Sequence, residues 1–179
     1  MTDPAVSAGP SSTSWRFVNV MLVILALLLV AASAFFFIDS ANASPADEKE
    51  AALSREYRAV TKAAEAETVA FLTVDYTDMD PLIEKVLAGA TGPFKSQYDG
   101  AKTNLKASAQ TAQAVSTGKV LSTGIADIDD SNAVVFVAAD SQVKNKSTKG
   151  KAEPRYYRLK LTMTRKGGQW LMSDLQFVS

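Results

Sequence analysis

An uncharged apolar stretch near the N-terminus constrains this chain more than any other feature. It covers residues 17–38 and contains no charged residue and no proline. As an α-helix it would be about 33 Å long, enough to cross the ~30 Å hydrocarbon core of a bilayer. Trp15 and Arg16 precede it, at the position where interfacial residues are expected. The sequence therefore predicts one transmembrane helix over residues 15–38.

The charges on either side of this stretch predict its orientation. Arg16 precedes it, whereas Asp39, Asp47 and Glu48 are the first charged residues that follow. Because basic residues favour the cytoplasmic side, we expect a single-pass plasma-membrane protein with a cytoplasmic N-terminus and an extracytoplasmic C-terminal part. The small-x-small triplet Ala41-Asn42-Ala43 leaves a cleavable signal peptide as an alternative. The apolar stretch is longer than the core of such a peptide, so we favour an uncleaved anchor.

Composition divides the rest of the chain. Residues 1–14 are rich in Ser, Ala, Pro, Gly and Thr and cannot bury enough apolar surface to fold, so a disordered cytoplasmic tail is expected there. Residues 39–46 are interpreted as a linker. Residues 47–179 are numerous enough to form one extracytoplasmic domain with its own core.

Charge and the missing residue types exclude several classes of function. Lys plus Arg and Asp plus Glu both number 19, so the basic surplus typical of nucleic-acid binding is lacking. The chain has no Cys and no His, and therefore no disulfide, no thiolate site and neither the commonest metal ligand nor the commonest general base. We expect a protein that is not an enzyme and that needs no cofactor or metal.

Start and stop signals predict three helices after the linker. Ser44-Pro45 followed by acidic residues begins the first, whose apolar spacing continues to about Val74. Asp80-Pro81 begins a second, short helix that ends at Gly89. Thr91-Gly92-Pro93 begins the third, with apolar residues again at helical spacing.

Strand patterns replace the helical period after Val115. Strands are predicted over residues 119–128, 133–143, 155–165 and 170–178, separated by turn clusters and a polar loop. A run of helices followed by a run of strands is typical of the α+β class. We expect three helices packed on a four-stranded, curved antiparallel sheet in a cone-shaped domain.

Ordered sequence segments give the chain a resemblance to a known family that extends over residues 17–178. These segments are Phe71–Tyr76, Asp80, Val86–Phe94, Tyr98, Tyr157–Met163 and Gly168–Leu175. In them the chain resembles the Mce-associated membrane proteins of actinobacteria, small single-pass proteins encoded beside the substrate-binding subunits of Mce lipid importers. The chain departs from many relatives in its Lys-rich loop over residues 144–151, where they have a short connection.

The resemblance implies both a fold and a role. The fold would be the nuclear-transport-factor-2-like cone, also called cystatin-like. The role would be that of an accessory, stabilising subunit of an Mce-type lipid or sterol import complex, with no catalytic residues to carry over. Its partners would be the substrate-binding and permease subunits and membrane lipid. The oligomeric state stays open.

Three other functions remain as alternatives. The domain could hold a lipid or steroid directly in an internal pocket. It could be an isomerase or dehydratase, because related cone folds include ketosteroid isomerases that use an Asp base and a Tyr, and Asp75-Tyr76 would supply such a pair. The structural interpretation has Tyr76 packed in the domain and Asp75 bonded to a helix end or a neighbouring strand. By fold analogy alone, the chain could also be a scaffold of a secretion channel.

Two charged groups of residues are further candidates for sites. Asp75, Asp78 and Asp80 could suggest calcium, but the spacing lacks the Gly and distal Glu of an EF-hand loop, and capping of a helix by Asp80 is the better interpretation. The last third of the chain is locally basic, with Arg155, Arg158 and Lys160 on or near one predicted strand. These residues predict a surface for an acidic partner or anionic lipid headgroups, although outward strand positions are commonly just solvated.

Trp170 is the last candidate, because it begins the final predicted strand. Its simplest role is core packing. If the cone were open at its mouth, Trp170 would instead line an apolar pocket.

Overall fold

The computed structural model describes residues 20–33 and 45–178. The chain divides into two units, Met1–Ala51 and Ala52–Ser179. In the first unit residues 20–33 form a helix in which every residue is exposed. The rest of the predicted span, the predicted tail and the first part of the linker lie outside the described residues.

None of the helices in the described ranges is long and apolar enough to cross a membrane.

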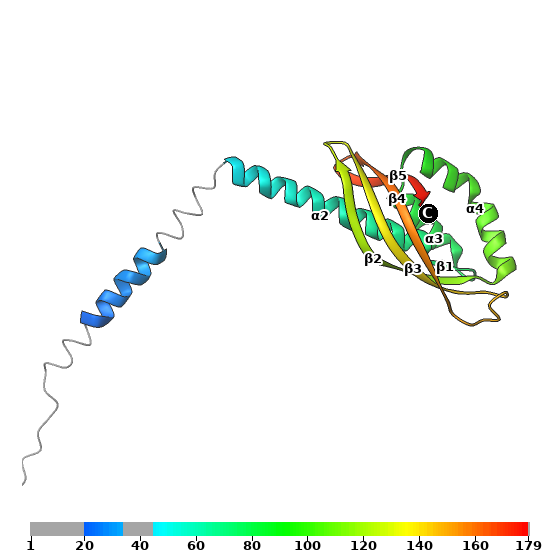
Figure 1. Cartoon of the computed structure of the whole chain (residues 1–179), viewed down its shortest axis with the longest axis horizontal. Coiled ribbons are helices and arrows are strands. Elements are labelled where there is room, and N and C mark those ends of the chain that lie inside the picture. Colours follow the sequence, from blue (N-terminus) through cyan, green and yellow to red (C-terminus); the bar gives the residue numbers. More distant parts are fainter. Residues whose placement is uncertain (1–19, 34–44, 179) are drawn as a thin grey trace, which may run out of the picture. The chain divides into compact units, whose positions relative to one another are not determined.

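The second unit is an α+β domain, and helix α2 enters it from the first unit (Figure 1). Its elements are α2 (Pro45–Leu72), β1 (Val74–Asp75), α3 (Met79–Gly89), α4 (Gly92–Ala112), β2 (Val115–Ile128), β3 (Asn132–Lys144), β4 (Glu153–Lys166) and β5 (Gln169–Phe177). The α+β class and the order of the three predicted helices are confirmed. The third helix ends at Gln113, a residue in the left-handed conformation whose amide reaches back to the last turn.

The sheet has five strands in the order β1-β2-β3-β4-β5, and all pairs are antiparallel. The prediction of four strands was therefore wrong by one. The extra strand, Val74–Asp75, pairs with Ser116 and Val115, and two residues are too few to show an alternating pattern. Strand β2 also begins earlier than predicted. The prediction missed this start because the first residues of the strand include Ser, Thr and Gly, which are typical of turns.

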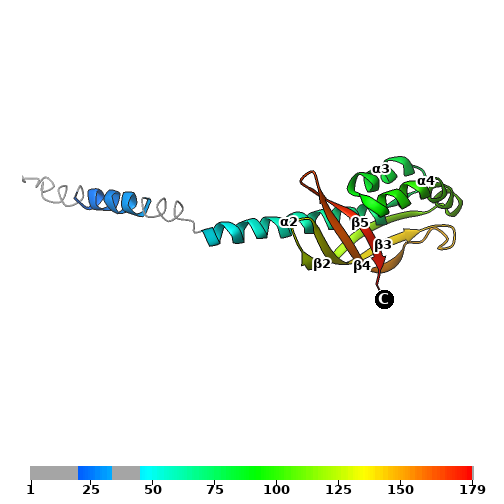
Figure 2. The same cartoon turned by 90° about the horizontal axis from the view of Figure 1, so that it is seen from above.

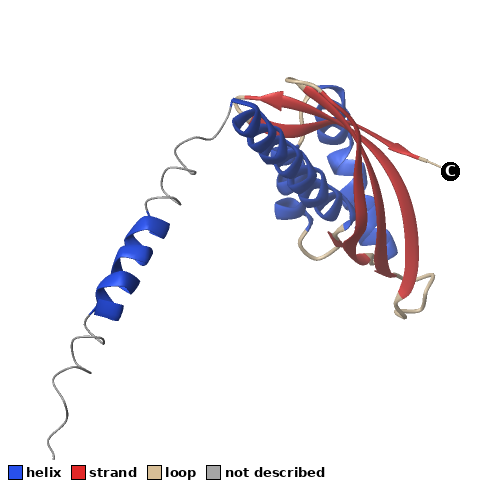
Figure 3. Ribbon diagram, turned by 60° about the vertical axis from the view of Figure 1, so that its left-hand side comes forward, coloured by secondary structure: helices blue, strands red, loops and turns tan. Residues whose placement is uncertain are grey.

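Irregular pairing bends this sheet. The register of β2 against β3 shifts between Val120 and Ser122 and again between Ile125 and Asp127. Strand β5 has a similar shift opposite Thr162 and Met163. An extra residue on one strand increases the local twist, and the strands accordingly curve over α2, with the helices on one face (Figure 3). The predicted curvature is confirmed.

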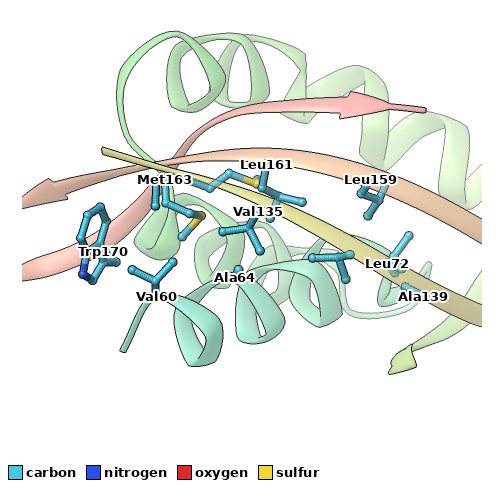
Figure 4. Close-up of a cluster of buried hydrophobic side chains, with 12 residues drawn as sticks. Val60, Ala64, Leu72, Val135, Ala139, Leu159, Leu161, Met163 and Trp170 are labelled. Atoms are coloured by element: carbon cyan, nitrogen blue, oxygen red, sulfur yellow. The ribbon is translucent and has the colours of Figure 1, made fainter. Parts of the chain in front are cut away.

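The main core lies between α2 and the concave face of the sheet. Val60, Ala64 and Leu72 of α2 face Leu159 and Leu161 of β4 (Figure 4). Both leucines are completely buried, which contributes about 1.5–3 kcal/mol for each side chain. The alternation predicted for this strand is thus confirmed.

A smaller cluster lies under α3 and α4, which pack side by side (Figure 2). It consists of buried Met79, Ile83 and Ala109, with Tyr76 and Tyr98 packed partly against it. Helix α3 contributes no residue to the main core cluster. The domain therefore has one large core and a second, thinner one.

Candidate functional site

The convex side of the sheet, which faces away from the helices, carries large exposed apolar side chains. Leu121 is 53% exposed, Phe136 is 44% exposed and Tyr156 is 76% exposed. On β4, Arg158 and Lys160 alternate with the buried leucines and therefore point to the same convex side. We call these five residues the outer face.

Strand pairing brings the members of the outer face together. Phe136 stands directly opposite Lys160, and both Leu121 and Arg158 border Ala138. Leu121 is the extra residue of the first bulge of β2, which explains why a leucine is exposed there. A groove of about 360 Å³ runs over this region, lined by Leu121, Ala138, Ala139, Tyr156, Tyr157, Arg158 and Val178.

The surroundings of the outer face are less basic than the predicted surface. Asp140, opposite Tyr156, and Asp174, opposite Thr162, are at outward positions too. The sequence could not reveal these acidic neighbours, because it does not show which strands pair. The surface is apolar at its centre and mixed in charge around it, and within the described residues neither Arg158 nor Lys160 forms an ion pair.

Arg155 does not belong to this surface. It occupies the opposite side of β4 from Arg158, because the two positions are three residues apart along the strand, without a register shift between them. Its guanidinium lies 3.8 Å from the carboxylate of Glu153, and both side chains are exposed. Such a pair contributes little to stability.

Asp75 and Tyr76 each make local contacts at the end of β1. Oδ1 of Asp75 accepts hydrogen bonds from the Thr77 hydroxyl at 2.7 Å and the Thr77 amide at 3.0 Å. These bonds lower the pKa of Asp75. The Tyr76 amide donates to the carbonyl of Ala114 at 3.0 Å, and its side chain packs against the smaller cluster. Asp75 thus holds a local turn, with Thr77 as its partner in place of the predicted helix end or strand.

The third acid of this region does not cap a helix, so that interpretation was wrong. Asp80 is the second residue of α3, whose N-cap residue is Asp78. The carboxylate of Asp80 instead pairs with Lys106 of α4. Within the described ranges no group of three or more His, Cys, Asp or Glu side chains is placed to hold a metal ion.

Trp170 is a core residue that also binds α2. It is 6% exposed, and its indole Nε1 donates to Oε1 of Glu56 at 2.6 Å. The guanidinium of Arg165 lies 3.1 Å from the same oxygen and 6.0 Å from the centre of the Trp170 ring. The candidate residues from the sequence therefore do not form one site. Among the basic ones, only Arg158 and Lys160 share a surface, the outer face.

A buried carboxyl group on α2 was not among the sequence candidates. Glu67 is 4% exposed, and its Oε1 has no hydrogen-bond partner. Burial raises the pKa of Glu67 to about 8, and the positive charge of Lys85 offsets this only in part. Burial and the nearby Glu67 in turn raise the pKa of the Tyr98 hydroxyl. Its position in the sequence could have predicted this burial, because Glu67 lies three residues after Ala64 and four before Phe71, on the core-facing side of the helix.

Sequence comparison identifies relatives of the chain. Residues 15–179 match the family described as Rv1363c/MT1408-like uncharacterized proteins. The protein Rv1363c of Mycobacterium tuberculosis is 33% identical over 129 residues, which are 71% of this chain and 49% of that protein. The chain therefore spans about half the length of the curated relative it matches.

Three solved structures share the fold. CagV, a VirB8 homolog of the Helicobacter pylori type IV secretion system, has a TM-score of 0.55 at 6% identity, over 68% of this chain and 98% of that one. An IcmL-like type IV secretion system protein from Legionella pneumophila has a TM-score of 0.54 at 13% identity, over 66% and 88%. The periplasmic domain of DotI has a TM-score of 0.53 at 14% identity, over 68% and 94%. At these identities the likeness is one of fold, whereas the sequence match over residues 15–179 shows that the chain belongs to the Rv1363c/MT1408-like family of actinobacterial proteins.

Proposed function

We propose that the chain is a non-enzymatic accessory subunit of an Mce-type lipid or sterol import complex in the plasma membrane. It has a nuclear-transport-factor-2-like domain outside the cytoplasm. It acts by protein–protein contact and stabilises the substrate-binding and permease subunits. The observation that carries the proposal is the outer face, where apolar side chains and two cations without ion-pair partners lie together in the described part of the domain.

The helix over residues 20–33 supports anchoring in a membrane. Its residues are apolar apart from Ser33, and all of them are exposed. The hydroxyl of Ser33 donates to the carbonyl of Leu29 at 2.8 Å, so this polar group is satisfied within the helix. A helix that is apolar on every side needs an apolar environment, and it lies within the uncharged sequence stretch of residues 17–38, which is long enough for a bilayer.

The outer face supports contact with a protein partner. Phe136 and Tyr156 expose aromatic surface, and aromatic residues together with Arg are enriched at the centres of protein interfaces. Arg158 adds a guanidinium suited to a carboxylate of the partner. The mixed charge around the centre fits a protein partner better than an anionic lipid surface, which would repel Asp140 and Asp174.

Removal of the outer face tests this function. Deleting the protein should lower the level of the importer's other subunits, and the intact chain should restore it. A chain carrying Phe136→Ala, Arg158→Ala and Lys160→Ala should restore less than a tenth of that level, because hot-spot truncations of this kind cost 2 kcal/mol or more, roughly 30-fold each in affinity.

The matched control removes two cations from the polar loop instead. Lys146→Ala with Lys149→Ala changes the net charge by the same amount, at exposed positions outside the outer face. This control should restore the subunits fully. Normal subunit levels and unchanged lipid uptake in the deletion strain would contradict the proposed function, and equal effects of both variants would show that charge alone matters.

A scaffold of a secretion apparatus is the second candidate. It is favoured by the fold shared with two type IV secretion system proteins, the IcmL-like protein and CagV. Crosslinking in intact membranes, followed by mass spectrometry of the captured proteins, separates the two. Importer subunits among the products support the first function, and components of a secretion channel support the second.

A further inference from the structure

The buried carboxyl of Glu67 lies where three helices meet. Glu67 belongs to α2, and a Cβ atom added to Gly89 at the end of α3 would lie 1.8 Å from its Oε2. Tyr98 of α4 is close enough for the charge of Glu67 to affect its hydroxyl. The close approach of α3 thus depends on a residue without a side chain at position 89.

The environment of this carboxyl suits only its neutral form. Its Oε1 is buried without a partner, and an unpartnered carboxylate at such a position costs far more than a neutral acid. The charged or titratable groups that act on it are Lys85 of α3 and Tyr98 of α4. Among the described residues, no other buried polar side chain is titratable, so the strands present no further charge from the interior.

Helix α3, with 11 residues, is the shortest of the three helices of the domain. Its buried residues are Met79, Ile83 and Val86. The first two belong to the smaller cluster, and none of the three belongs to the main core cluster. Its ion pair to α4, between Asp80 and Lys106, is exposed and therefore weak.

Both ends of α3 are fixed to the sheet side of the domain. Before the helix, the Asp78 amide donates to the Asp75 carbonyl at 3.0 Å, next to β1. After it, the Thr91 amide donates to the Met172 carbonyl of β5 at 2.8 Å. A short helix between two anchored points can open locally while the rest of the domain stays folded.

We propose that α3 is a cover over Glu67 that closes when the carboxyl is protonated and opens when it ionises. In the open form the carboxylate reaches water, and Met79 and Ile83, which α3 contributes to the smaller cluster, become accessible. The device couples proton uptake to closure of the interior between α2, α3 and α4.

Linkage predicts the pH dependence of this opening. The carboxyl titrates near its ordinary value of 4.5 when open and near 8 when closed. The opening constant should therefore rise about tenfold for each pH unit between these values and level off above the higher one. From pH 5 to pH 7 the rise is roughly 100-fold.

Hydrogen exchange of the full-length chain in detergent measures this opening. After correction for intrinsic exchange rates, the protection factors of the α3 amides should fall roughly 100-fold from pH 5 to pH 7. The α3 amides should also be less protected than those of β3 at every pH. In the Glu67→Gln variant the α3 protection should be independent of pH.

Two results would overturn the proposal. Equal protection of α3 and β3 amides throughout would mean that α3 opens only when the whole domain unfolds. A pH-dependent α3 in Glu67→Gln would assign the effect to another group. A second variant gives an independent check, because Gly89→Ala should lower α3 protection at pH 5 with Glu67 present and leave it unchanged in a Glu67→Ala background.

Discussion

Replacing Glu67 with glutamine is expected to stabilise the domain by about 3 kcal/mol at pH 7 and to have almost no effect near pH 4. In the folded state the acid is already neutral up to about pH 8, so an isosteric neutral amide changes the packing little. In the unfolded chain the native acid ionises above its ordinary pKa of 4.5. The native protein therefore loses stability as pH rises between these two values, and the variant does not.

The sign follows from proton binding. Between the two pKa values the folded state holds a proton that the unfolded state has released, so the free energy of unfolding falls as pH rises. Below the lower value both states are protonated and the full stability is present. Above the higher value both are ionised and the loss is constant. A gain of this size is a large part of the 5–15 kcal/mol typical of a whole domain.

Chemical denaturation from pH 4 to pH 9 measures this prediction. Trp170 is buried and reports unfolding by fluorescence, and Trp15→Phe in all variants removes the only other tryptophan. Glu84→Gln on α3 is the matched control, because this carboxyl is exposed and its replacement should change the free energy by less than about 0.5 kcal/mol. Parallel pH curves for the native chain and Glu67→Gln would refute a neutral buried acid.

Replacing Gly118 with alanine is expected to destabilise the domain by about 3 kcal/mol. An added Cβ would lie 2.5 Å from the Cβ of Leu72 and 3.5 Å from the Leu72 backbone. A Cβ cannot rotate away from such a contact, so the end of α2 and strand β2 must separate. The separation also strains the hydrogen bond from the Ser116 hydroxyl to the Leu72 carbonyl, which is 2.7 Å long.

Gly124 on the same strand provides the control. An added Cβ there meets no atom within 4 Å, and Gly124→Ala should change the free energy of unfolding by no more than about 0.5 kcal/mol. The measurement is the same denaturation at a single pH. Equal effects of the two substitutions would mean that backbone freedom, and not contact with Leu72, determines the cost.

Elements with a regular period could be predicted from the sequence, because burial imposes that period. The alternation along β4 placed Leu159 and Leu161 in the core and Arg158 and Lys160 outside it. The helix starts at proline and the end near Gly89 follow from local backbone chemistry. Strand β1 had no such signal, since only its pairing with β2 defines it.

The site was less predictable than the fold, because sites depend on which segments meet. The acids beside the predicted basic surface could not be foreseen, since Asp140 and Asp174 come from neighbouring strands. Sequence spacing revealed neither the hydrogen bond from Trp170 to Glu56, which is distant in sequence, nor the local one from Thr77 to Asp75. The sequence places Glu67 on the core side of α2. Only the structure identifies it as a candidate site, through the close approach of Gly89 and the lack of a hydrogen-bond partner for Oε1.

The two bulges of β2 affect whether neighbouring copies of this domain can pair through their sheets. Strand β1 pairs only with Val115 and Ser116, so the remainder of β2 forms an outer edge of the sheet. A long, flat edge would recruit strands from neighbouring molecules and lead to aggregation. The bulges at Leu121 and Ala126 divide this edge into short runs. Many copies of the domain can therefore lie close together without their sheets pairing edge to edge.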